Sequence, residues 1–253
     1  MKFNVISSGS KGNCTLIING DKVIVLDLGV SKKRIEEALK GYGLSFNNIE
    51  AYFITHTHHD HASNCYQADI NKLYATTDTL DKVENKLPPT HIIKPFSTFY
   101  IDGFKISSFP LSHDDKVITV GFIIECDDEK LIYLTDTGFV PEKTMPLLQN
   151  PDYLLIESNH DPKMLWQSSR PEYLIRRIIS DTGHLSNYDS GYYIANLIAD
   201  NTKEVVLLHL SEECNTKDIA LNTVKKVIVE QLGYLPDIIY KASSSDKETK
   251  GGS

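Results

Sequence analysis

The seven residues 55–61 read Thr-His-Thr-His-His-Asp-His and concentrate the side chains best suited to binding a metal ion. Four of the nine histidines of the chain lie in this stretch, next to one aspartate. The candidate ligands in it are His56, His58, Asp60 and His61. Zinc, manganese and iron all accept such a mixture of imidazole and carboxylate. A single histidine on an apolar face is usually a core residue, but packing does not explain so dense a cluster, and the stretch therefore predicts a metal site.

Three further candidate ligands are far apart in the sequence but share one position, the end of an apolar segment that we predict to be a strand. They are His113, Asp136 and His209. Taken singly, either histidine fits a core position equally well, and their shared placement at strand ends favours ligands. A carboxylate at Asp136 can bridge two ions. We therefore expect a pair of divalent metal ions per chain, and the mixed ligand set fits zinc and manganese alike.

The composition is that of a soluble globular protein. Of the 253 residues, 41% are hydrophobic and 24% are charged. No apolar run approaches the roughly 18 residues that span a bilayer. The N-terminus reads as a strand rather than a signal peptide, so we expect a cytoplasmic protein without membrane contact. Four widely spaced cysteines, without a Cys-x-x-Cys pair, argue against a cysteine-based zinc site and against a disulfide framework.

The acidic charge balance bears on the substrate. The formal net charge is −8, and the chain has no lysine- or arginine-rich run beyond Lys32-Lys33-Arg34. Proteins that bind long stretches of nucleic acid usually offer a basic surface, because phosphate contacts dominate that affinity. The balance favours a small substrate, or a nucleic-acid end held mostly by metal, although a charge count leaves a local basic groove open.

Apolar periodicity predicts a layered α/β fold, with strands crowded in the first half and strands alternating with helices in the second. We expect strands at residues 3–7, 15–19, 22–28, 51–55, 73–76, 105–109, 117–124, 130–135, 153–157 and 205–210. We expect helices between Ser31 and Gly43 and at residues 79–86, 171–180, 187–199 and 216–232. One domain should span residues 1–240. Residues 241–253 have no apolar side chain beyond Ala242 and should form a disordered polar tail.

The His-x-His-x-Asp-His loop, with the later histidine, aspartate and histidine, resembles the pattern of the metallo-β-lactamase superfamily. The resemblance implies an αββα sandwich of two mixed β-sheets flanked by helices, and a pair of metal ions. The ligands implied for one ion are His56, His58 and His113. Those implied for the other ion are Asp60, His61 and His209. Asp136 would bridge the two ions, and Asp27 would orient one of the ligands.

Five further segments resemble the YycJ/WalJ group of this superfamily. They are residues 8–13, 135–138, 157–161, 183–187 and 209–211. Members of the group are metal-dependent phosphodiesterases, including 5′→3′ DNA exonucleases. Phage anti-Pycsar phosphodiesterases, which hydrolyse cyclic mononucleotides, are similar in length and architecture. The resemblance spans residues 2–220 and implies a nucleotide phosphodiester as substrate in either case.

His184 is the candidate proton donor. Phosphodiester hydrolysis needs a hydroxide nucleophile, neutralisation of phosphate charge and a proton for the leaving oxygen, and a metal pair supplies the first two. Ribonuclease Z relatives carry a histidine paired with a glutamate for the third, which implies His184 as the acid and Glu157 as its partner. Asp60 would accept or orient the proton of the attacking water. Alternatively, His184 caps the helix that begins near Ser186.

These features predict a di-metal phosphodiesterase. The first expected substrate is a 3′,5′-cyclic mononucleotide, in an anti-Pycsar-like evasion of immunity, and the alternative is a 5′→3′ DNA exonuclease. A thioesterase or lactonase is less favoured, because an acyl hydrolase with a good leaving group has little use for a Glu157/His184 pair. A binding module without activity would have lost ligands, whereas all seven candidates are present. We also expect a homodimer, in which the polar segment 162–170 serves as a lid or as an interface.

Overall fold

Two mixed β-sheets lie face to face in the computed structural model, which describes residues 1–82, 91–114 and 116–253. The first sheet has the strand order β13-β1-β2-β3-β4-β5. Its strands are β1 (Lys2–Ser7), β2 (Cys14–Asn19), β3 (Lys22–Leu26), β4 (Ile49–Phe53), β5 (Leu73–Tyr74) and β13 (Thr249–Gly252). The second sheet has the order β12-β11-β10-β9-β8-β7-β6. Its strands are β6 (Thr98–Ile101), β7 (Phe104–Leu111), β8 (Thr119–Cys126), β9 (Glu129–Leu134), β10 (Tyr153–Glu157), β11 (Glu204–Leu208) and β12 (Ile239–Ala242).

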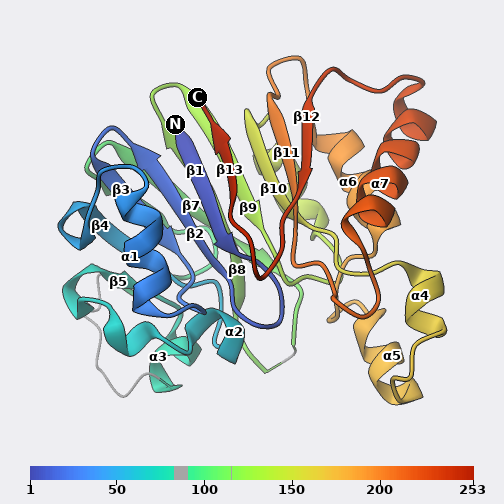
Figure 1. Cartoon of the computed structure of the whole chain (residues 1–253), viewed down its shortest axis with the longest axis horizontal. Coiled ribbons are helices and arrows are strands. Elements are labelled where there is room, and N and C mark those ends of the chain that lie inside the picture. Colours follow the sequence, from blue (N-terminus) through green and yellow to red (C-terminus); the bar gives the residue numbers. More distant parts are fainter. Residues whose placement is uncertain (83–90, 115) are drawn as a thin grey trace.

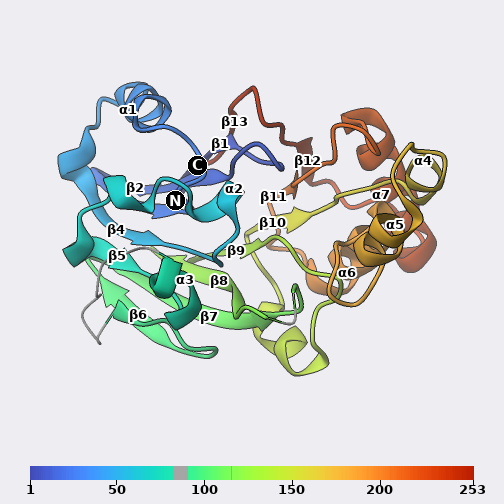
Figure 2. The same cartoon turned by 90° about the horizontal axis from the view of Figure 1, so that it is seen from below.

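Helices cover the outer faces of both sheets (Figures 1 and 2). The α-helices of the described residues are α1 (Lys32–Lys40), α2 (His59–Ala62), α3 (Thr77–Lys82), α4 (Pro162–Trp166), α5 (Glu172–Ile178), α6 (Asn187–Leu197) and α7 (Lys217–Leu232). The α1 helix buries Ile35 and Leu39 in a cluster with the first sheet. The α7 helix buries Val224 and Ile228 against the second sheet. The predicted αββα sandwich is therefore confirmed.

The strands are apolar on both faces because one face packs on the opposite sheet and the other face packs under helices. Phe53 of the first sheet packs edge to face on Phe122 of the second, with ring centroids 5.5 Å apart. The opposite faces of the sheets are buried under the helices, so every residue of β10 and of β11 is buried. Strands covered on both faces read as continuous apolar runs, which is the pattern by which most of them were predicted.

The strands that lead to the candidate ligands all end at one edge of the sandwich. In the second sheet, β9, β10 and β11 run parallel. β7 is antiparallel to β8, which is antiparallel to β9, so β7 points the same way as β9. In the first sheet, β3, β4 and β5 are parallel to one another. This edge lies at the bottom of Figure 1, near α2 and α5 and opposite the two chain ends.

The prediction of a disordered tail over residues 241–253 is wrong. β12 adds to the second sheet beside β11, and β13 pairs antiparallel with β1, with Gly251 opposite Phe3. An edge strand is held by backbone hydrogen bonds, which need no apolar side chains, so composition did not reveal it. Glycine also permits the close approach, because a Cβ at Gly251 would lie 2.2 Å from Cζ of Phe3.

Other segments also differ from the prediction. No strand was expected where β6 lies, at Thr98–Ile101. The helix expected at 79–86 begins earlier, as α3 (Thr77–Lys82), and its expected end lies outside the described residues. The polar segment 162–170, for which no helix was expected, contains α4, which is capped where the Asp161 carboxylate accepts a hydrogen bond from the Met164 amide at 2.8 Å. A lid or interface role for this segment, like the homodimer, stays a prediction. Among the described helices, none is both long and apolar enough to cross a membrane.

Candidate metal centre

All seven candidate ligands meet at the edge of the sandwich where the strands end. They form overlapping groups, in each of which every side chain offers one ligand atom and all these atoms lie within 4.8 Å of one another. The groups are His56–His58–His113, His56–His61–Asp136, Asp60–His61–His209 and Asp136–Glu157–His184–His209. Adjacent groups that share members are what a pair of neighbouring metal ions requires.

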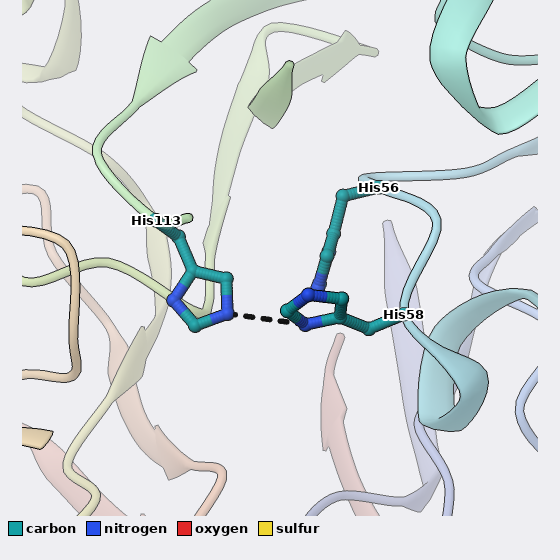
Figure 3. A group of neighbouring side chains, drawn as sticks. All are labelled: His56, His58 and His113. Atoms are coloured by element: carbon teal, nitrogen blue, oxygen red, sulfur yellow. Dashed lines mark hydrogen bonds between the residues drawn. The ribbon is translucent and has the colours of Figure 1, made fainter. Parts of the chain in front are cut away.

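The first group combines two histidines that follow a strand of the first sheet with one that follows a strand of the second sheet (Figure 3). His56 and His58 lie on the segment between β4 and α2, and His113 follows β7 and faces them, with its Nε2 3.2 Å from Nδ1 of His58. Nδ1 of His113 donates to the Gly183 carbonyl at 2.9 Å, which leaves the Nε2 lone pair directed at the other rings. Nε2 of His56 is buried and has no hydrogen-bond partner within the described chain. A buried nitrogen is costly when unpaired, and a cation here would satisfy it.

Asp136 belongs to two of the groups, one with His56 and His61 and one with Glu157, His184 and His209. Its Oδ2 is 2.8 Å from Nε2 of His61, and its Oδ1 is 4.0 Å from Nε2 of His113. On the far side, Nε2 of His209 lies 3.3 Å from Oδ2 of Asp60. Oδ1 of Asp136 also lies 3.4 Å from Nδ1 of His209. The Asp136 carboxylate therefore lies near histidines of more than one ligand group, as a bridging carboxylate would.

Asp27 holds His61 in one orientation. Its Oδ2 accepts from Nδ1 of His61 at 2.7 Å, and its Oδ1 accepts from the Thr55 amide at 2.9 Å. The hydroxyl of Tyr133 also donates to Oδ2, at 3.3 Å. Because Asp27 engages Nδ1, Nε2 is the atom of His61 that would bind a metal, so the contacts fit the orienting role expected for Asp27.

Four side chains at strand ends of the site sit on backbone with positive φ. They are Asp27 (61°), Asp114 (52°), Asp136 (55°) and His209 (53°). This left-handed region is uncommon for residues other than glycine, although aspartate, asparagine and histidine are enriched there. Such conformations cluster at functional sites, where surrounding contacts hold them. Asp114 illustrates this, because its Oδ2 lies 3.3 Å from Nε2 of His58.

Asn13 is a site residue that sequence reasoning did not identify. Its Nδ2 donates to Oδ2 of Asp60 at 3.1 Å and lies 2.9 Å from Nε2 of His61. Its backbone amide donates to the Asp60 carbonyl at 2.7 Å. Close to this contact, a Cβ on Gly29 would lie 1.7 Å from the same carbonyl oxygen, so only glycine fits. The segment 8–13 carried a family resemblance, but only its contact with the loop after β4 reveals what Asn13 does.

The ionisable groups of the site strongly perturb one another. Burial raises the pKa of Asp136, but His209 and His61 outweigh burial and hold that pKa well below its ordinary value. Burial lowers the pKa of His61, but the carboxylates of Asp27 and Asp136 outweigh it and raise that pKa well above its ordinary value. The pKa of His209 rises to about 10 for the same reason, again against burial, with Asp136 the strongest opposing influence. In the protein chain alone, protons balance the buried carboxylates. Divalent cations would take over that role and release the protons.

His184 and Glu157 form a hydrogen-bonded pair beside this cluster. Nδ1 of His184 lies 2.7 Å from Oε1 of Glu157, and Oε2 accepts from the amides of Thr137 at 3.0 Å and Leu185 at 3.1 Å. Burial raises the pKa of Glu157, but His184 outweighs burial and that pKa falls to about 2. The cap of α6 is Ser186, whose hydroxyl accepts from the Asp189 amide, so the cap alternative for His184 is wrong. His184 instead lines a cavity of about 150 Å³ together with His209.

We predict that the freshly purified protein carries about two transition-metal ions per chain, because the overlapping groups offer enough ligands for a pair. Chelation should lower the unfolding temperature, since an ion that binds only the folded state at 100 times its Kd adds about 2.7 kcal/mol to the free energy of unfolding. Elemental analysis and thermal unfolding test both statements. Protein that contains no metal, and takes up none on soaking, would contradict the assignment.

Comparison with known proteins identifies the family to which the chain is similar. A family model described as "Beta-lactamase superfamily domain" matches residues 25–210. The chain is 31% identical over 240 residues to exodeoxyribonuclease YycJ of Bacillus anthracis, covering 91% of this chain and 90% of that one. It is 32% identical over 262 residues to exodeoxyribonuclease WalJ of Streptococcus pneumoniae serotype 2, covering 98% and 96% of the two chains. The fold resembles Zn²⁺-bound PqqB of Methylobacterium extorquens with a TM-score of 0.66 at 15% identity, over 98% of this chain and 99% of that one.

Proposed function

The chain belongs to the metallo-β-lactamase superfamily, and from that premise we propose that it is a metal-dependent phosphodiesterase that acts on DNA, a 5′→3′ exodeoxyribonuclease. The hydrogen-bonded pair of His184 and Glu157 beside the ligand cluster is the observation that carries the proposal. Two relatives that match over nine tenths or more of both chains are named exodeoxyribonucleases, which supports DNA as the substrate.

The histidine and aspartate clusters are typical of the dinuclear metal site of this superfamily. The proposed ligands of one ion are His56, His58 and His113. The proposed ligands of the other ion are Asp60, His61 and His209. Asp136 is the proposed bridge between the two ions. Bound there, the ions would supply a nucleophilic hydroxide at neutral pH and neutralise charge on the phosphate.

His184 donates the proton that the leaving oxygen needs. Glu157 accepts the hydrogen bond from Nδ1 and so fixes the ring, which leaves Nε2 as the atom that transfers a proton. Because an alkoxide is a poor leaving group, this transfer matters most for a phosphodiester of a sugar hydroxyl. Asp60 remains ionised, since hydrogen bonds from His209 and His61 outweigh burial and lower its pKa, and its carboxylate accepts a hydrogen bond from the attacking water.

The same pair argues against an acyl hydrolase. A thioester or an activated lactone expels a leaving group that needs little protonation, so a His184/Glu157 pair 2.7 Å apart would have no task there. Between the two phosphodiester substrates, the named relatives favour DNA over the cyclic mononucleotide that the net charge had suggested. A cyclic nucleotide therefore becomes the competing outcome of the test.

The metal-loaded enzyme should release mononucleotides from the 5′ end of labelled duplex DNA and leave cAMP, cGMP, cCMP and cUMP intact. Products are separated on denaturing gels for DNA and by liquid chromatography for the cyclic nucleotides. Asp60→Ala, purified in parallel, shows whether a contaminating nuclease contributes. Linear mononucleotides from the cyclic set, with DNA untouched, would replace the proposed substrate by the cyclic one.

A further inference from the structure

Two arginines stand at the cavity beside the metal centre. The cavity has a volume of about 150 Å³, and its lining includes both His184 and His209. Arg177, on α5, and Arg170, just before this helix, line the same cavity. Figure 1 shows α5 and α2 at the same end of the molecule, at the bottom of the view. The reacting groups and two permanent positive charges therefore share one small space.

Arginine is scarce in this chain, which makes its position informative. Only four of the 26 basic residues are arginines, and they are Arg34, Arg170, Arg176 and Arg177. The guanidinium of Arg34 is used inside the fold, where it donates to the carbonyls of Ile6 at 2.7 Å and Ser245 at 3.1 Å. The other three lie within eight residues of one another, and two of them reach the cavity. A planar guanidinium matches the geometry of a phosphate, which a lysine does not.

The guanidinium groups at the cavity keep donors available. Arg170 uses its Nε to bind Oε2 of Glu213 at 3.0 Å, and its side chain is 27% exposed. Nη2 of Arg177 lies 3.9 Å from Oδ2 of Asp114, beyond hydrogen-bond distance. In residues 1–82, 91–114 and 116–253, neither the Arg177 guanidinium nor the terminal nitrogens of Arg170 donate a hydrogen bond. Exposed ion pairs of this kind contribute little to the free energy of unfolding, so stability does not explain why the two arginines lie at the cavity.

Arg177 also lies close to the metal ligands. The Asp114 carboxylate oxygen that faces it is 3.3 Å from Nε2 of His58, so one carboxylate separates the guanidinium from a candidate ligand. The remaining wall includes apolar side chains, among them Leu174, Ile178 and Leu210. Cavities for drug-sized ligands hold roughly 300–1,000 Å³, so this one suits a single unit of a strand whose remainder lies outside.

We propose that Arg170 and Arg177 form a second phosphate-binding subsite, which holds the phosphate next to the scissile one. This inference rests on the proposed phosphodiesterase function and narrows its substrate to a strand with consecutive phosphates. A cyclic mononucleotide has one phosphate, so its hydrolysis would leave the two arginines without a ligand. The subsite also explains how a chain with a net charge of −8 binds DNA, since its positive charge is placed locally at the cavity.

Binding of a fluorescein-labelled single strand to the metal-loaded enzyme in a His184→Ala background, followed by fluorescence anisotropy, tests the subsite. Arg170→Gln and Arg177→Gln should each raise Kd about tenfold and reduce the salt slope of log Kd by roughly 0.7, one lost phosphate contact each. Arg176→Gln is the matched control, because this side chain is 68% exposed, pairs with Glu172 on its own helix and does not line the cavity. Equal effects of Arg176→Gln and Arg177→Gln, or no effect of either cavity variant, would overturn the proposal.

A second control separates phosphate binding from a structural role of Arg170. If Arg170 only anchors Glu213, then Glu213→Gln should weaken DNA binding as Arg170→Gln does. If Arg170 binds phosphate, Glu213→Gln removes a competing negative charge and should leave Kd equal or lower. The mirror experiment replaces the phosphate adjoining the scissile one by a neutral methylphosphonate in a thymidine trinucleotide. The enzyme with both arginines should prefer the charged trinucleotide about tenfold in kcat/KM, and the double glutamine variant should lose that preference.

These measurements distinguish the subsite from the proposed function. An enzyme that cleaves DNA with equal kcat/KM on both trinucleotides keeps its function and loses the subsite. An enzyme that cleaves only cyclic nucleotides, and binds the strand equally well with and without the two arginines, loses both.

Discussion

Replacing His184 by alanine lowers kcat on DNA by roughly 10²–10⁴-fold, the range expected for loss of a positioned general acid. The protein should keep its metals, because Nδ1 of His184 is engaged by Glu157 at 2.7 Å and the first three ligand groups are complete without it. Since His184 also belongs to the fourth group, with Asp136, Glu157 and His209, elemental analysis of the same variant is needed. A loss of metal equal to the loss of activity would make His184 a ligand.

Substrates with different leaving groups test whether His184 supplies a proton. With bis-p-nitrophenyl phosphate, whose leaving group is stable as an anion, the defect of His184→Ala should shrink markedly. His59→Ala is the matched control, because His59 is exposed in the same metal loop and belongs to none of the ligand groups. Equal losses with acidic and alkoxide leaving groups would instead assign His184 to phosphate binding or to structure.

The candidate ligands could be named from the sequence because their signal is local. His56 to His61 lie within one short loop, and the ends of buried parallel strands must meet at one edge of a sheet. For His113 and His209, an apolar run before the histidine was enough to place each side chain at that edge. The positions of most strands followed from the same apolar runs. Backbone pairing at sheet edges carries no such signal, which is why β13 was missed.

Contacts between distant segments could not be predicted in this way. Asn13 reaches Asp60 across 47 positions, and Asp114 reaches His58 across 56. Nothing near either residue in the sequence marks its partner. Net charge carries little information on the substrate for a related reason, since −8 is a sum over the chain, whereas the proposed subsite depends on where the fold places Arg170 and Arg177. The preference for a small substrate relied on the net charge of the whole chain. The two arginines at the cavity instead favour a DNA strand as the substrate.

Asp136→Asn should be the most damaging single substitution in the metal centre. It keeps the shape of the side chain and suits the left-handed backbone at φ 55°, so the fold should survive. It removes the negative charge that lies 2.8 Å from Nε2 of His61 and 4.0 Å from Nε2 of His113, between the two ligand groups. A neutral amide oxygen is a weaker ligand than a carboxylate and bridges two cations poorly. Activity should therefore fall about 10³-fold or more, which corresponds to roughly 4 kcal/mol of transition-state stabilisation.

The pattern of metal loss tests the bridging role proposed for Asp136. In elemental analysis, His113→Ala should lose mainly one ion, because His113 belongs only to the group with His56 and His58. Asp136→Asn should deplete both positions, and added zinc or manganese should raise its unfolding temperature far less than that of the unmodified protein. If Asp136→Asn instead keeps one ion fully bound, as His113→Ala does, Asp136 serves a single ion. The contact between Asp136 and His61 would then serve only to orient that histidine, not to join two metal positions.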